Sequence, residues 1–312
     1  MSIDIGRKHM RAFLRTTALF LMLTLVFALL GVLIGYFFTD IWLGVLIMII
    51  FAVIINLYAF VFSKKTVLRR HKVKIITEAQ NPRLYNIVKN ISEKAGLPMP
   101  QVGITNNPSP NAFATGRGPK DAAVVATSGL LTLLNDEELA GVMAHELAHV
   151  KNRDVMIMSI AATVGGVIAF IGSRLWILAF MSGGNNKNGA AMIAAAIVGA
   201  ITFPLAAMLI QMSISRGREF GADRTGAMFT GNPMALASAL RKLEGGIAHA
   251  PMSNTRNNDG LADAHLWIEP PAAKSGGVSS LFSTHPKTAD RVARLEAMVA
   301  GVPVTAENNP FV

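Results

Sequence analysis

Residues 135–152 read NDEELAGVMAHELAHVKN, and this stretch predicts a helix with two metal-binding side chains on one face. Asn135 and Glu138 have the spacing of a capping box, which begins a helix at the next residue. On that helix His145 and His149 are four residues apart, so both imidazoles can reach one metal ion. The rest of the chain must therefore be searched for the remainder of a metal site.

Glu146 directly follows the first histidine and would lie beside a water molecule bound to that metal. Two neutral nitrogen ligands with an adjacent carboxylate are typical of a zinc-dependent peptidase, in which the carboxylate takes a proton from the attacking water. The alternative is that both histidines are ordinary packed residues of an amphipathic helix. We expect one Zn²⁺ per chain.

A catalytic zinc site has three protein ligands and one open position. The chain has no cysteine, so the third ligand must be a histidine or a carboxylate. Glu219 and Asp223 stand one helical turn apart, directly after an apolar stretch. If residues 155–214 form a hairpin, Glu219 returns to the helix of His145 and completes the coordination, while Asp223 orients a ligand imidazole. The alternative for both acidic residues is a solvated flank of a membrane segment.

The composition indicates a membrane protein. Hydrophobic residues make up 52% of the chain and charged residues 15%, with a mean hydropathy of +0.43. Two runs without a charged residue, 16–38 and 41–62, lie on either side of Asp40. Each run is long enough to cross the hydrocarbon core of a membrane. They predict a hairpin that turns at Thr39 and Asp40. A secretory signal is the alternative for the N-terminus, but the first run is too long for one and leads directly into the second.

Residues 155–181 and 190–214 predict a second hairpin, although Arg174 and several glycines interrupt the first of these stretches and buried soluble helices are the alternative. Lys and Arg gather at 7–15, at 64–74 and at both ends of the second hairpin. This distribution places both termini and the catalytic segments in the cytoplasm and explains the net charge of +10. A nucleic-acid interface is not expected, because the chain has only three Tyr and three Trp.

The expected fold is an α+β membrane protein that is mostly helical, with two transmembrane hairpins (about four apolar spans) and a cytoplasmic zincin-like metallopeptidase domain with a small sheet. A helix is predicted from Pro82 to a stop at Gly96, and another over residues 288–300. Short strands are predicted at 101–105, 111–115 and 122–127. The expected segments are an N-terminal hairpin at 1–63, two parts of the catalytic domain at 64–154 and 215–312, and the second hairpin at 155–214.

Several motifs together resemble the HtpX branch of the M48 family of membrane metallopeptidases. They are HELAH at 145–149, SRGREFGAD at 215–223, NAFATGR at 111–117, and FSTHP at 282–286 followed by Arg291. The resemblance covers nearly the whole chain. It implies that His145, His149 and Glu219 bind zinc and that Glu146 is the general base. One departure is a pair of glycines, at 217 and 221, which replace bulkier residues in the helix of Glu219 at a cost of about 1 kcal/mol each relative to alanine.

The resemblance also implies roles that spacing alone does not indicate. His285 and Arg291 would stabilise the oxyanion of the tetrahedral intermediate or contact the substrate backbone. Asn111, with Ala112 and Phe113, would contact the substrate along an edge strand. Without the resemblance, His285 is a turn residue before a proline, and Arg291 lies on the polar face of an amphipathic helix.

The expected function is hydrolysis of peptide bonds in unfolded or membrane proteins, as part of protein quality control under stress. The expected location is the cytoplasmic (inner) membrane of a bacterium, with the lipid bilayer and protein substrates as partners and no nucleic acid. A CAAX-type prenyl-protein processing peptidase shares these motifs, and a non-catalytic metal-binding scaffold would need no Glu146. An intramembrane protease would have this motif inside a segment embedded in lipid. Here charged residues follow the motif from Lys151, which indicates a site near the membrane surface. Residues 251–280 would cover the cleft or form a connector.

Overall fold

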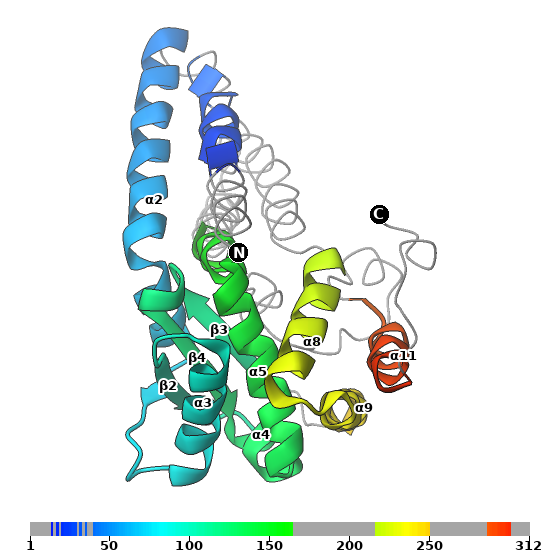
Figure 1. The fold of residues 1–312 in the computed structure, drawn as a ribbon. Helices are drawn as coiled ribbons and strands as arrows, with labels where there is room; N and C mark the ends of the chain where they lie inside the picture. Colours follow the sequence, from blue (N-terminus) through cyan, green and yellow to red (C-terminus); the bar gives the residue numbers. More distant parts are fainter. Residues whose placement is uncertain are drawn as a thin grey trace.

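A small sheet and several helices lie at one end of a single long helix in the computed structural model (Figure 1). The structure describes residues 14, 17–18, 20–29, 31–32, 35, 40–164, 216–249 and 286–300. In chain order the elements are α2 (Ile41–Arg70), β1 (Lys74–Ile75), α3 (Pro82–Ala95), β2 (Gln101–Thr105), β3 (Ala112–Gly116), the 3-10 helix η1 (Pro119–Asp121), β4 (Ala122–Thr127), α4 (Ser128–Leu133), α5 (Asp136–Asn152), α8 (Arg216–Thr230), α9 (Pro233–His249) and α11 (Thr288–Val299). The described residues are mostly helical with a small sheet, as predicted.

Within the described residues, α2 is the one helix that is long and apolar enough to cross a membrane. Asp40 begins it, because the Asp40 carboxylate accepts hydrogen bonds from the backbone N–H groups of Trp42 and Leu43. Phe20–Leu29 and Asp154–Val164 are shorter apolar helices. Most of the predicted second hairpin lies outside the described residues, so the arrangement of four spans stays a prediction.

The first two apolar segments pack against each other, as the predicted hairpin requires. A Cβ built on Gly44 of α2 would lie 2.4 Å from the carbonyl oxygen of Gly31, so only a glycine permits this approach. Leu23 and Phe27 are buried against α2, next to Ala52. At Gly31 and Gly44 the two segments are thus in direct backbone contact, and further along they pack through side chains.

The sheet has the strand order β1-β2-β4-β3. Strand β4 is parallel to β2, with Gln101 opposite Ala123, and antiparallel to β3, with Ala112 opposite Ala126. Strand β1 is antiparallel to β2. Within the described residues, strand β3 is therefore an edge strand of this sheet.

Strands 101–105 and 122–127 are confirmed as predicted, whereas the strand predicted at 111–115 is observed one residue later, as β3. Asn111 stays outside the strand because its side chain accepts a hydrogen bond from the N–H group of Ala112, at 3.0 Å. The N–H group of Asn111 donates to the Thr127 hydroxyl, at 2.8 Å. The N–H group of Thr127 donates to the carbonyl of Asn111, at 2.9 Å, so the side-chain bonds add to a backbone bond at the strand entry.

Both predicted helix starts in this region are confirmed by their caps. The Asn81 side chain accepts from the N–H group of Leu84, and Gly96 ends α3 with a left-handed φ of 65°. In α5 the Asn135 side chain accepts from the N–H group of Glu138, and the Glu138 carboxylate accepts from the N–H group of Asn135. These boundaries are set by residues three or four positions apart, which is why the sequence predicts them.

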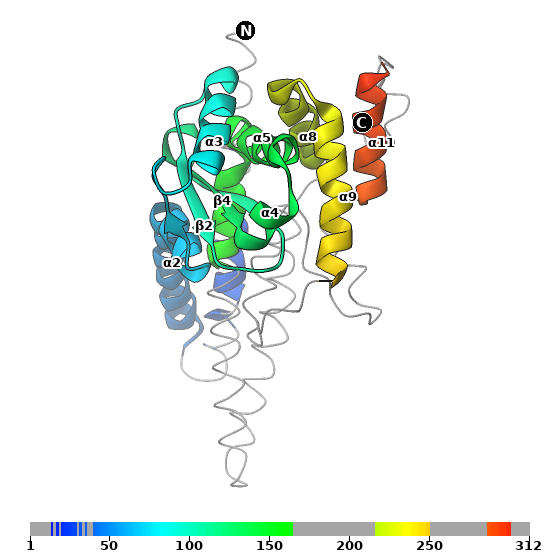
Figure 2. The same ribbon diagram turned by 90° about the horizontal axis from the view of Figure 1, so that it is seen from below.

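Helix α5 lies at the centre of the fold. It packs on the sheet and α3 on one side and on α8 and α9 on the other, with α11 beyond them (Figures 1 and 2). The buried residues of these elements form one continuous hydrophobic core. Because α5 carries the His-Glu-x-x-His motif, the motif is buried between the sheet and α8 rather than displayed at the surface.

Glu138 also attaches α5 to α9. Its side chain is 4% exposed, accepts a hydrogen bond from the Ser238 hydroxyl at 2.7 Å, and lies 2.7 Å from the ammonium group of Lys242. Burial raises the pKa of Glu138, but the hydrogen bonds from Lys242 and Ser238 outweigh it and keep this pKa below its usual value. The capping carboxylate is therefore charged at neutral pH and joins two helices.

Candidate metal centre

The centre is built where α8 crosses α5 at very short range. A Cβ built on Gly226 of α8 would lie 2.8 Å from the backbone nitrogen of His145 and 2.9 Å from the carbonyl carbon of Ala144. Only a glycine allows the two helices to approach this closely. The crossing brings Asp223, and Glu219 one turn before it on the same helix, to the face of α5 that carries the two histidines.

Three buried side chains converge at this crossing, in the manner of a metal site. His145, His149 and Glu219 each offer one ligand atom, and these atoms all lie within 4.8 Å of one another. The two Nε2 atoms are 3.2 Å apart. Oε2 of Glu219 lies 3.6 Å from Nε2 of His145, and Oε1 of Glu219 lies 3.5 Å from Nε2 of His149.

The separation of the two histidine nitrogens fits a tetrahedral zinc ion. Ligands at roughly 2.0–2.1 Å from a tetrahedral ion are about 3.3 Å from each other. The Nε2–Nε2 separation of 3.2 Å is close to that value, and both oxygens of the Glu219 carboxylate lie beside the two nitrogens. Two histidine nitrogens and one carboxylate, with one position left for water, are also a known set of ligands for catalytic zinc.

A carboxylate holds the second nitrogen of each imidazole. Nδ1 of His145 lies 2.9 Å from Oδ1 of Asp223, and Nδ1 of His149 lies 3.3 Å from Oδ2 of Asp154. When a neutral imidazole donates its Nδ1–H to a carboxylate, the lone pair of Nε2 is left for a metal. Both lone pairs then point at the same place, where the Glu219 carboxylate also points.

Asp223 is held in turn by Arg291. Nε and Nη2 of Arg291 donate to the two oxygens of the Asp223 carboxylate, at 2.9 and 2.7 Å. The Arg291 side chain is fully buried, and its Nη2 lies 3.5 Å from Nδ1 of His145. The structure therefore places Arg291 behind Asp223, where its effect reaches the metal ligand through the carboxylate.

The charges in this group favour a cation at His145. Burial lowers the pKa of His145, but its hydrogen bonds with Asp223 and Glu219 outweigh it and raise this pKa to about 9. Burial raises the pKa of Asp223, but the charge of Arg291 and its hydrogen bonds lower this pKa to about 2. Asp223 is thus ionised at neutral pH, and a proton and a metal ion compete for the ring of His145.

The residues predicted to contact a substrate lie at β3. Asn111 precedes this edge strand and is 3% exposed. The side chains of Ala112 and Phe113 are fully buried, and that of Phe113 packs with Val67 and Val125. All five residues of β3 are buried, so the predicted contact of this strand with a substrate stays a prediction.

The structure brings together most of the predicted site residues. Glu146 is buried on α5 between the two histidines in sequence, and Glu219, Asp223 and Arg291 reach the same centre from α8 and α11. His285 lies outside the described residues. Its predicted role therefore stays a prediction.

Two residues of the centre were not predicted. Asp154 stands directly beyond the end of α5, where it was interpreted only as part of a charged flank; its position five residues after His149 was the available signal. Gly226 carries no chemical signal in the sequence, because a glycine in a helix is recognised as a close contact only once the neighbouring helix is known.

This chain is similar to known proteins in two comparisons. Residues 78–299 match the family described as Peptidase family M48. Among solved structures, the chain is similar to that described as "Crystal Structure of S. mikatae Ste24p", with a TM-score of 0.48 and 16% sequence identity over 93% of this chain and 67% of that chain. The family match includes α5, α8 and α11, which carry the side chains described above.

Proposed function

Because this chain belongs to peptidase family M48, and is on that ground a metallopeptidase, we propose that it is a membrane-anchored zinc metalloendopeptidase. Its substrates are damaged or misfolded proteins, including membrane proteins, as expected of an HtpX-like protease. One observation carries the proposal: the Nε2 atoms of His145 and His149 lie 3.2 Å apart while each Nδ1 faces a carboxylate. Two Nε2 lone pairs that face each other beside the Glu219 carboxylate favour a bound cation, for which a metal ion and a proton compete.

His145, His149 and Glu219 would hold the zinc ion. When bound, zinc lowers the pKa of a coordinated water toward about 7 and polarises the scissile carbonyl. Glu146 accepts the proton of the attacking water and passes it to the leaving amine nitrogen. Asp223 and Asp154 keep the two imidazoles in the tautomer that binds the metal.

A peptide substrate would be bound along β3 as an added strand. Within the described residues β3 is an edge strand of the sheet, and pairing with an edge strand recognises any extended chain. Since the side chains of Ala112 and Phe113 are buried, selection rests on an extended backbone more than on particular side chains. This favours unfolded proteins as substrates, because folded proteins rarely present a free strand.

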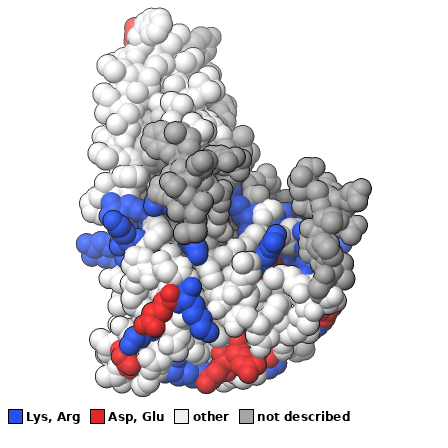
Figure 3. All heavy atoms as spheres, viewed as in Figure 1, with Lys and Arg blue, Asp and Glu red and all other residues white. Residues whose placement is uncertain are grey.

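The proposed location is the inner membrane of a bacterium, with the catalytic residues and both termini on the cytoplasmic side. Helix α2 supports membrane attachment by its length and composition. The first basic residue of α2 is Lys64, at the end of the helix nearest the sheet. Figure 3 shows Lys and Arg side chains gathered where the uncharged upper part of the molecule meets the rest. This distribution is typical of the cytoplasmic side.

The test is cleavage of an unfolded protein by the full-length chain in detergent, with Glu146→Gln beside the wild type. We expect at least about a 100-fold loss of activity in Glu146→Gln with one zinc ion still bound. The matched control is Glu137→Gln, because Glu137 is an exposed carboxylate on the same helix, and its activity should equal that of the wild type. Equal cleavage by wild type and Glu146→Gln would refute the mechanism.

A prenylated C-terminal peptide is offered in parallel as a second substrate. The proposal requires that the unfolded protein be cleaved. Cleavage of the prenylated peptide alone would instead assign the chain to CAAX-type processing.

A further inference from the structure

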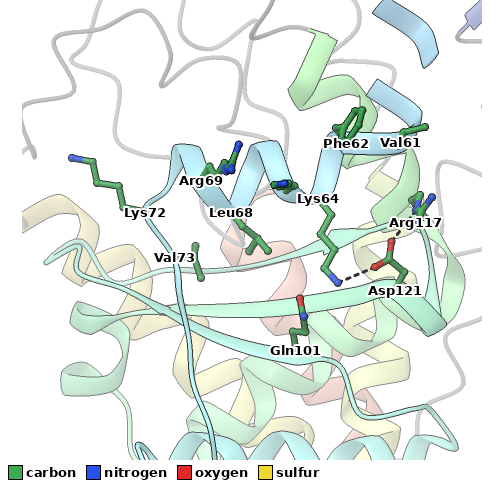
Figure 4. Close-up of a pocket in the computed structure, with 11 residues that line it drawn as sticks. Val61, Phe62, Lys64, Leu68, Arg69, Lys72, Val73, Gln101, Arg117 and Asp121 are labelled. Atoms are coloured by element: carbon green, nitrogen blue, oxygen red, sulfur yellow. Dashed lines mark hydrogen bonds and ion pairs between the residues drawn. The ribbon is translucent and has the colours of Figure 1, made fainter. Parts of the chain in front are cut away.

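A cavity of about 380 Å³ lies where α2 meets the sheet, away from the metal centre (Figure 4). The last turns of α2 form one wall, and Gln101 of β2 and the turn between β3 and β4 form the other. This volume lies within the range of sites that hold small ligands. No step of peptide hydrolysis proposed above uses it.

The cavity is strongly cationic. Among its lining residues one is acidic, Asp121, and five are basic: Lys64, Lys65, Arg69, Lys72 and Arg117. The Asp121 carboxylate is held by Lys64 at 2.9 Å and by Arg117 at 2.8 Å (Figure 4). In the described part of the chain, the other three basic side chains have no acidic partner. An anion that enters the cavity therefore meets excess positive charge.

The cavity also lies at the level of a membrane surface. Residues 41–63 of α2 carry no charge and extend over about 34 Å, which matches the hydrocarbon core of a bilayer. Val61 and Phe62 line the cavity and are 42% and 44% exposed. One turn earlier on the same helix, Leu57 is 62% exposed. An apolar surface thus runs from the cationic cavity into the predicted bilayer.

The end of α2 supports a role for the basic side chains. The N–H group of Val73 bonds to the carbonyl of Leu68, and that of Lys72 to the carbonyl of Arg69, as in a Schellman motif. Lys72 occupies the left-handed position of this motif, with a φ of 50°, where glycine is preferred. This turn ends α2 at the cavity and keeps the side chain of Lys72 among the residues that line it.

We propose that this cavity binds the phosphate headgroup of an anionic phospholipid, with Arg69 and Lys72 as principal contacts. The acyl chains lie along the exposed apolar residues of α2, beginning at Val61 and Phe62. A free phosphate ion would use the charges but not this apolar surface, which is why the lipid is the favoured occupant.

The test is native mass spectrometry of the full-length protein in neutral detergent, titrated with phosphatidylglycerol, phosphatidylcholine or inorganic phosphate. We expect phosphatidylglycerol to bind in preference to phosphatidylcholine, and millimolar phosphate not to displace it. Arg69→Gln with Lys72→Gln should weaken phosphatidylglycerol binding by about 25-fold, because each basic side chain near an anionic headgroup contributes about fivefold. Binding should also weaken as salt is added.

The matched control is Lys89→Gln with Lys94→Gln, which removes two exposed positive charges from α3 and should leave lipid binding unchanged. Zinc binding of both double variants should equal that of the wild type, which verifies their fold. Equal phosphatidylglycerol affinity in wild type and Arg69→Gln/Lys72→Gln would overturn the proposal, as would equal binding of both lipids. Displacement by phosphate would assign the site to a free anion.

Lys72→Gly separates recognition from structure. Glycine relieves the left-handed φ, so the variant should unfold at a higher temperature than the wild type. Its phosphatidylglycerol affinity should nevertheless fall about fivefold. Unchanged lipid affinity in this more stable variant would remove Lys72 from the site.

Discussion

Nδ1 of His145 lies 2.9 Å from a carboxylate oxygen of Asp223, although 78 positions of sequence number separate the two residues. The same carboxylate receives two hydrogen bonds from Arg291. A predicted metal ligand is thus held by a buried carboxylate and a buried guanidinium.

Asp223→Ala should weaken zinc affinity by roughly 10- to 100-fold, because the imidazole of His145 loses the group that fixes its tautomer and orientation. The measurement is competition for zinc against a chromogenic chelator. Asp290→Ala, which removes a carboxylate from the first turn of α11, serves as the control and should bind zinc as the wild type does. Unchanged affinity in Asp223→Ala would show that the contact does not support the metal.

Arg291→Met should lower the free energy of unfolding by about 3–5 kcal/mol, because it leaves the buried Asp223 carboxylate without its main counter-charge. The double variant Arg291→Met/Asp223→Asn should recover part of this loss, since the uncompensated charge is gone. Chemical denaturation in detergent measures both. Additive losses in the double variant would mean that the two side chains do not interact.

Gly226→Ala and Gly221→Ala should have opposite effects, although both replace a glycine in α8. At Gly226 the new methyl group would meet backbone atoms of α5 that cannot move aside, so we expect a loss of about 1–3 kcal/mol and weaker zinc binding. At Gly221 no atom of the described residues lies within 4 Å of the new methyl group, and alanine should stabilise the helix by about 1 kcal/mol without changing zinc affinity. Thermal unfolding with zinc titration compares them; similar behaviour would contradict the crossing described here.

Glu138→Gln should destabilise the protein by about 2 kcal/mol at pH 7, because charged hydrogen bonds to Lys242 and Ser238 are lost. The folded pKa of Glu138 lies below its usual value of 4.5, so its stabilisation is complete above about pH 4.5 and is lost as the pH falls through the folded pKa. The difference between wild type and variant should therefore shrink in acid. Unfolding is measured with excess chelator, so that zinc release does not contribute, and a difference that stays constant with pH would contradict this account.

Much of the local structure could be predicted because it depends on residues a few positions apart. The capping pair Asn135 and Glu138, the helix stop at Gly96 and the shared face of His145 and His149 are all of this kind. The strand entry at Asn111 was placed one residue early, because its side-chain bonds to Thr127 and Ala112 cannot be foreseen from alternation of apolar residues.

The sequence by itself determined the motif helix, its two metal-facing histidines, the adjacent Glu146 and an apolar helix of membrane length. Each follows from helical periodicity, from capping or from hydrophobic length. It also indicated Glu219 as a candidate metal ligand and Asp223 as a candidate partner of a ligand imidazole. Both interpretations assumed that residues 155–214 form a hairpin that brings the chain back to the helix of His145.

Only the tertiary structure decided how these groups meet. The Glu219 carboxylate reaches both imidazoles because Gly226 lets α8 touch the backbone of α5, and Asp154 reaches His149 from beyond the end of its helix. Arg291, expected at a substrate, is found fully buried against Asp223. Such contacts depend on the steric fit between helices far apart in the chain, which no local pattern of residues encodes.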